Sequence, residues 1–101
     1  MAVLMIAKFK GSPSELKTAY DKSSKLLEEQ TGSALPPGAV RHACALSDDA
    51  LFVVDIWESE EVLRGTIESD QFEQMLTSQG FPSPRNAEIQ ILQVHATIPP
   101  L

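Results

Sequence analysis

Two residues of complementary chemistry, His42 and Asp55, are the strongest candidates for catalysis in this sequence. They lie on two alternating segments around Ser47-Asp48-Asp49, a composition that suits a tight reversal between antiparallel strands. A hairpin closed there sets His42 opposite Asp55, and directly opposed side chains on one face touch. An imidazole held by a carboxylate can act as a general base, because its unperturbed pKa lies near neutrality. We therefore predict a catalytic pair; the alternative is that the two merely satisfy each other as buried polar groups.

The same register places Cys44 opposite Val53 and Val40 opposite Trp57. Trp57 offers a large flat face for an aromatic substrate together with an N–H donor. We therefore expect Trp57 to line a ligand pocket, with Val53 and Leu51 of the same strand beside it as substrate-binding residues. The alternative for the tryptophan is simple packing at the end of the strand.

A second histidine, His95, alternates onto one face with Ile89, Ile91 and Gln93 and is a further candidate for substrate binding. A surface position or a contact between subunits is the alternative for it. Two histidines and one cysteine on different strands make a weak set of zinc ligands, so we predict no metal site. Cys44 alternates with apolar neighbours and has no activating group nearby in the sequence, which favours a small core residue over a nucleophile.

These candidates depend on a sheet and two helices that the hydrophobic pattern predicts. Pro13 suits the first turn of a helix and Gly32 its end, while Ser69-Asp70 marks a break in a second helix that Gly80 closes. The expected elements are a strand over 2–9, a helix over 13–31, strands over 39–46 and 50–57, a helix from about 58 to 79 and a strand over 87–98. The order βαββαβ predicts a ferredoxin-like α+β domain spanning 1–101, with a four-stranded antiparallel sheet and both helices on one face.

The hydrophobic pattern also predicts which side of the sheet the helices cover. On the second hairpin strand, Phe52, Val54 and Ile56 form the more uniformly apolar face, so we expect them to lie under the helices. Asp55 and Trp57, with the histidine opposite the aspartate, would then point into the cavity of a barrel.

A homodimer is expected because two helices cover only one face of such a sheet, yet both faces are apolar. Large exposed apolar patches mark interfaces, and two-fold pairing is the commonest way to cover them. A second copy packed sheet against sheet would make a dimeric α/β barrel. The alternative is a monomer that holds a larger ligand.

Composition narrows the class of partner. The chain of 101 residues carries a net charge of −6 and no basic run, which argues against nucleic acid and against a membrane surface as partners. The apolar start of the chain is too short to span a membrane and lacks the features of a signal peptide. One cysteine and no targeting signal together predict a cytoplasmic protein.

The stretch Asp55-Ile56-Trp57-Glu58-Ser59-Glu60-Glu61, followed by Phe72 and Met75, resembles the dimeric α/β-barrel superfamily, in particular its antibiotic-biosynthesis-monooxygenase-like members. Those proteins commonly carry Trp-x-Ser-x-Glu where the third strand enters the second helix. The resemblance implies a cofactor-free monooxygenase, a polyketide cyclase or an isomerase. It does not extend to the haem-degrading members, because this chain has no asparagine before Asn86 and no histidine on the second helix.

The resulting prediction is a cofactor-independent enzyme acting on a small apolar, aromatic or polyketide-like metabolite. His42 would abstract a proton with support from Asp55, while Trp57 orients the ring. Oxygenation would follow if oxygen meets the carbanion, and cyclisation or isomerisation if it does not. No glycine-rich dinucleotide loop is present, so no nicotinamide or flavin is expected. The alternative from another class is a non-catalytic dimer that binds a small molecule or a partner.

Overall fold

The computed structural model describes residues 1–101 and has the predicted order of strands and helices. The second helical segment is divided in two and is followed by a short 3-10 turn, η1. The elements are β1 (Val3–Lys10), α1 (Pro13–Thr31), β2 (Ala39–Leu46), β3 (Ala50–Trp57), α2 (Glu60–Ile67), α3 (Asp70–Ser78), η1 (Pro84–Asn86) and β4 (Glu88–Gln93).

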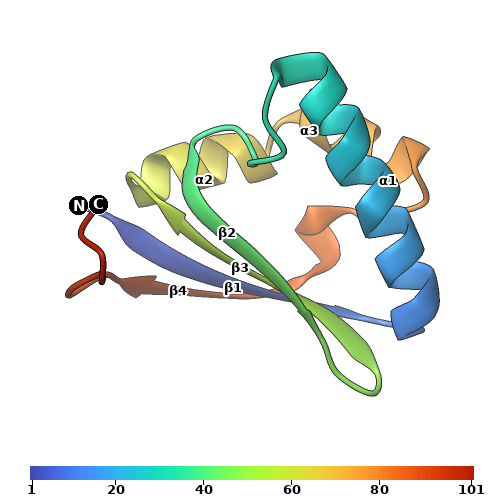
Figure 1. Ribbon diagram of the computed structural model, residues 1–101, viewed down its shortest axis with the longest axis horizontal. Coiled ribbons are helices and arrows are strands. Elements are labelled where there is room, and N and C mark those ends of the chain that lie inside the picture. Colours follow the sequence, from blue (N-terminus) through green and yellow to red (C-terminus); the bar gives the residue numbers. More distant parts are fainter.

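The four strands form one sheet in the order β2-β3-β1-β4, with every neighbouring pair antiparallel. All three helices lie on the same side of this sheet, and its other side carries no element (Figure 1). This is the ferredoxin-like α+β arrangement, so the predicted fold class is confirmed.

Serine caps explain why the second helical segment breaks where the sequence predicts. The Ser59 hydroxyl accepts a hydrogen bond from the backbone N–H of Val62, and the Ser69 hydroxyl accepts one from Phe72, which begins a new helix after α2. Gly32 ends α1 in a left-handed conformation, with φ of 81°. No helix combines the length and the apolar character that a membrane crossing requires.

Strand β4 is shorter than predicted, because its neighbour offers nothing further to pair with. Val3 is the first residue of β1, and it pairs with Gln93. One more backbone bond follows, from the N–H of Val94 to the carbonyl of Ala2 at 3.0 Å. His95 therefore lies beyond the sheet and is exposed.

The prediction that Phe52, Val54 and Ile56 lie under the helices is wrong. The side chains of β3 that are buried against the helices are the alternate ones, Leu51, Val53, Asp55 and Trp57. The error arose because the face with a carboxylate looked less suited to a core. A buried carboxylate is tolerated under the helices when other side chains satisfy it, as they do here.

The hairpin register is as predicted except at its far end. Ala39 pairs with Trp57 and the ladder is irregular between Ala39 and Arg41, so the expected pairing of Val40 with Trp57 is wrong. Val40 is the extra residue of this bulge and is 38% exposed. The bulge does not disturb the pairing of His42 with Asp55.

Candidate functional site

A cavity opens between the helices and the face of the sheet that they cover. Measured by where the centre of a water molecule can lie, its volume is about 80 Å³, several times what one buried water needs; the hollow with its solvent-open mouth is about 690 Å³. Its wall is mostly apolar, with Met5 from β1, Leu27 from α1, and Phe72 and Met75 from α3. The apolar lining suits a small apolar or aromatic ligand. Pockets that enclose a drug-sized ligand start at about 300 Å³, so such a ligand would extend into the mouth or widen the cavity.

The predicted pair of His42 and Asp55 meets on this wall. The two residues are partners in the β2–β3 ladder, and Nδ1 of His42 hydrogen-bonds to Oδ1 of Asp55. The side chain of Asp55 is 1% exposed and that of His42 is 15% exposed. The carboxylate therefore lies at the back of the site, where it fixes the imidazole ring from behind.

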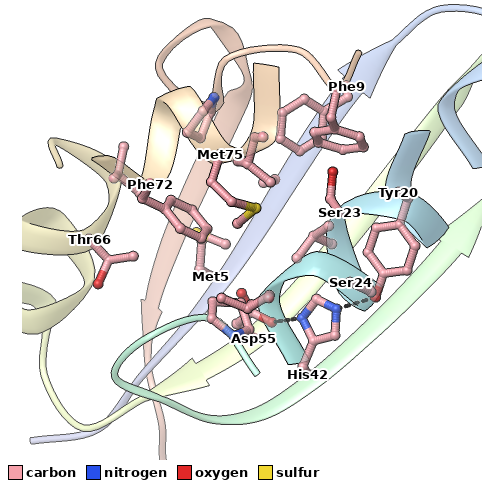
Figure 2. Close-up of a pocket in the computed structure, with 18 of the residues that line it drawn as sticks. Met5, Phe9, Tyr20, Ser23, Ser24, His42, Asp55, Thr66, Phe72 and Met75 are labelled. Carbon is pink, nitrogen blue, oxygen red and sulfur yellow. Dashed lines mark hydrogen bonds and ion pairs between the residues drawn. The ribbon is translucent and has the colours of Figure 1, made fainter. Parts of the chain in front are cut away.

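Tyr20 of α1 extends this pair into a chain of three groups. Its hydroxyl hydrogen-bonds to Nε2 of His42, and the two rings lie 5.8 Å apart with their planes inclined by 8°. Figure 2 shows the phenol, the imidazole and the carboxylate in sequence, joined by two hydrogen bonds. Burial raises the pKa of the Tyr20 phenol above its ordinary value of 10.0, so the phenol is neutral and donates its proton to the chain.

Sequence reasoning missed Tyr20 because its spacing from Leu16 and Ala19 places it in the apolar stripe of α1, where the ordinary role of a side chain is packing. Two signals could have found it. It is the only tyrosine, and the stripe must face the same side of the sheet as the buried residues. A buried phenol also needs a hydrogen-bond partner, and a histidine on the facing strand supplies one.

Trp57 lines the cavity and carries an unpartnered donor. The residue is 1% exposed, and its indole N–H is buried without a hydrogen-bond partner. Gly38 keeps the chain close to the ring with φ of +90°; a side chain there would collide with Val62 and lie 3.5 Å from the indole. The indole is thus fixed, and a buried N–H without a partner is costly unless something accepts from it.

Two other hydroxyls on the wall are engaged with the backbone, whereas that of Ser24 lies beside the Tyr20 phenol and partly offsets the rise that burial causes in its pKa. Ser23 donates to the carbonyl of Ala19 at 2.9 Å, and Thr66 donates to the carbonyl of Pro37 at 2.6 Å. These bonds hold α1 and the loop before β2 in place. The polar groups that remain on the wall are the phenol with the adjacent Ser24 hydroxyl, the imidazole, the carboxylate and the indole.

The remaining predicted site residues divide into two groups. Val53 lines the cavity as expected, whereas Leu51 is fully buried below it and His95 lies outside it. Burial raises the pKa of the Cys44 thiol above 9.0, which keeps it in the un-nucleophilic form. No group of three or more histidine, cysteine, aspartate or glutamate side chains is placed to hold a metal ion.

Comparisons with known proteins agree with this fold. No family model matches the sequence, and no curated protein matches it. Among solved structures, SnoaB, a cofactor-independent oxygenase from Streptomyces nogalater, superposes with a TM-score of 0.64 at 18% identity, over 97% of each chain. Rv0793 from Mycobacterium tuberculosis gives 0.62 at 16% identity, over 96% of this chain and 98% of that one.

A further solved structure comes from Caulobacter crescentus and is described as a proposed antibiotic biosynthesis monooxygenase. It gives a TM-score of 0.62 at 15% identity, over 92% of this chain and 89% of that one. At such identities the likeness establishes the fold and leaves the reaction open. Solved structures described as antibiotic biosynthesis monooxygenases thus share the fold of this chain, and the resemblance found in the sequence is confirmed at the level of the fold.

Proposed function

We propose that this protein is a cofactor-independent enzyme that performs acid/base chemistry on a small aromatic or polyketide-like metabolite. The observation that carries the proposal is the hydrogen-bonded chain of Asp55, His42 and Tyr20 on the wall of an apolar cavity. A carboxylate behind an imidazole stabilises the charged ring that forms when the imidazole takes a proton. Such a chain in a cavity that can exclude water suits the removal of a proton from carbon.

Trp57 would fix the orientation of the substrate in this reaction. Its indole N–H is buried without a partner, so a substrate oxygen could accept from it only after displacing the side chains that cover it, and that bond would then satisfy the donor. As the proton leaves, negative charge develops on that oxygen, and the same hydrogen bond becomes stronger. The substrate class is therefore an aromatic ketone or polyketide with an acidic C–H next to its carbonyl.

The fate of the carbanion distinguishes two reactions. If molecular oxygen enters, a methylene gains one oxygen atom to become a ketone, and the second oxygen atom leaves as water. If it does not, the carbanion is reprotonated or attacks a carbonyl of the same molecule, which gives isomerisation or cyclisation. SnoaB, described as a cofactor-independent oxygenase, has the same fold, which favours the first outcome.

We further propose that the protein acts as a homodimer in which two sheets pack face to face. The face that no helix covers has an apolar set of side chains, Ile6, Phe52, Val54, Ile56 and Leu92, and also carries Lys8, Arg41, Glu88 and Gln90. An apolar surface of this kind is stable in water when a second copy covers it. Because the cavity lies on the other face, each subunit would keep a complete site.

Exchange of carbon-bound hydrogen in deuterated water tests the proposal. The probe is β-tetralone, a bicyclic aromatic ketone whose acidic methylene lies between the ring and the carbonyl. We expect the protein to accelerate exchange of this methylene, followed by proton NMR. Asp55→Asn keeps the shape of the carboxylate and removes its charge, and it should slow exchange about 100-fold. Oxygen uptake under air then separates oxygenation from isomerisation.

His95→Ala is the matched control, because it removes the other histidine at an exposed position outside the cavity. It should leave exchange unchanged. Binding is followed separately through the fluorescence of Trp57, the only tryptophan. If the probe binds but neither wild type nor Asp55→Asn accelerates exchange, the enzyme hypothesis is wrong and the non-catalytic binding dimer takes its place.

A further inference from the structure

We propose that Tyr20 is the catalytic residue that exchanges the proton with the substrate, and that His42 acts only through it. This inference rests on the proposed function and deepens it. It assigns the reacting atom to the phenol oxygen of α1, which the sequence pattern presents as a packing residue.

The hydrogen bonds of His42 leave it no free nitrogen. Nδ1 is bonded to the Asp55 carboxylate, which can only accept, so Nδ1 carries the hydrogen. Nε2 is then the nitrogen with the lone pair, and that lone pair accepts from the Tyr20 hydroxyl. A substrate proton cannot reach His42 directly while this bond is in place.

The phenol oxygen is the end of the chain that a ligand can meet. Tyr20 lines the cavity and is half-buried, whereas Asp55 lies deepest, at 1% exposure. After donating its hydrogen to Nε2, the oxygen keeps lone pairs that can accept a proton. Burial holds the phenol in its neutral form, which is the form that passes a proton on.

The step balances without any other reactant. The C–H bond of the substrate breaks, and its proton forms a new O–H bond with Tyr20. At the same time the original phenol proton moves to Nε2 of His42, whose positive charge the Asp55 carboxylate offsets. The electron pair stays on the substrate as an enolate, whose oxygen accepts from the Trp57 N–H. Return of the two protons restores the starting state.

Tyr20→Phe tests this assignment with the same probe, β-tetralone in deuterated water. The variant keeps the ring and removes the hydroxyl, which frees Nε2 of His42. We expect exchange to fall about 100-fold, as it does in Asp55→Asn, while the dissociation constant from Trp57 fluorescence changes less than about threefold. If His42 took the proton directly, Tyr20→Phe would keep or increase the rate, and that result would overturn the inference while leaving the proposed function intact.

A second measurement separates chemistry from positioning. Because Tyr20 is the only tyrosine, growth on difluorotyrosine makes this phenol more acidic and changes no other residue of its type. The pH midpoint of exchange should move with the acidity of the phenol. A midpoint that stays in place would assign Tyr20 a positioning role only. If wild type does not accelerate exchange, the proposed function is wrong, and so is the inference that rests on it.

Discussion

The two faces of the sheet differ in the kinds of side chain that they carry. Under the helices, an apolar wall contains a buried carboxylate, an imidazole and an indole with one free donor. On the open face, β3 contributes only apolar side chains, Phe52, Val54 and Ile56, while the other strands add Lys8, Arg41, Glu88 and Gln90. Uniformly apolar side chains along one face of β3 are therefore no sign of the core here. The polar groups of the candidate site lie under the helices, and the open face is the one available to the proposed dimer.

The largest expected effect comes from placing a charge on each face at neighbouring positions of β1. Met5 is 5% exposed under the helices, whereas Ile6 lies on the open face. Met5→Asp would bury an unpaired carboxylate and should abolish folding, seen as loss of the cooperative thermal transition in circular dichroism. Ile6→Asp should stay folded and sediment as a monomer, while wild type sediments at twice the chain mass of 11.0 kDa.

Two results would break this comparison of the faces. Wild type that sediments as a monomer at every concentration would leave the open face without the proposed partner. An Ile6→Asp variant that remains a dimer would place the interface elsewhere on the molecule.

The next effect in size concerns the buried pair. His42→Ala leaves the Asp55 carboxylate without its imidazole in a place where the carboxylate is 1% exposed. Removing the hydrogen-bond partner of a buried carboxylate is strongly destabilising, and we expect a loss of about 3 kcal/mol in the free energy of unfolding at neutral pH, measured with urea. His95→Ala, at an exposed histidine, should change it by less than about 0.5 kcal/mol.

The double variant His42→Ala with Asp55→Asn sharpens this measurement. If the cost is an uncompensated charge, the amide should recover part of the stability that His42→Ala loses. Equal costs in the single and double variants would show that the loss comes from packing.

The smallest effect is a fall in stability at high pH. The pKa values of Tyr20 and Cys44 are both raised in the folded state, chiefly by burial. Above about pH 9 to 10 the unfolded chain gives up these protons before the folded one does, so stability is lost as the pH rises, by up to ~1.4 kcal/mol per pH unit for each group. Urea unfolding between about pH 8 and 11 should show this slope, and Tyr20→Phe should remove its upper part. An unchanged slope in that variant would contradict the burial of the phenol.

Most of the fold could be predicted, because local signals determine it. Both hairpin strands, the start of α2 at Ser59, the break at Ser69 and the end of α1 at Gly32 follow from turn and capping residues. The length of β4 could not be predicted, since it depends on where β1 begins. The bulge at Val40 was also hidden, because alternation of apolar residues alone does not reveal an extra residue.

The candidate site was predicted in part, for a related reason. The pairing of His42 with Asp55 follows from the turn, whatever face it points to, and Trp57 sits at the end of the same strand. To predict which face of the sheet carries the pair, one must know which side the helices cover. The sequence does not reveal this, because β3 has apolar residues on both faces. Tyr20 on α1 reaches His42 on β2, 22 residues further along the chain, and no local sequence pattern indicates such a contact.

The bond between Tyr20 and His42 also crosses from one layer of the molecule to the other. The side chains of α2 and α3 hydrogen-bond only within the helical segments and to loops, as Thr66 does to Pro37. A displacement of α1 away from the sheet would therefore interrupt proton transfer at the moment the cavity widens, whereas a displacement of α2 and α3 would not. A substrate that enters between the sheet and helices α2 and α3 would therefore meet the hydrogen-bonded chain of Tyr20, His42 and Asp55 already in place.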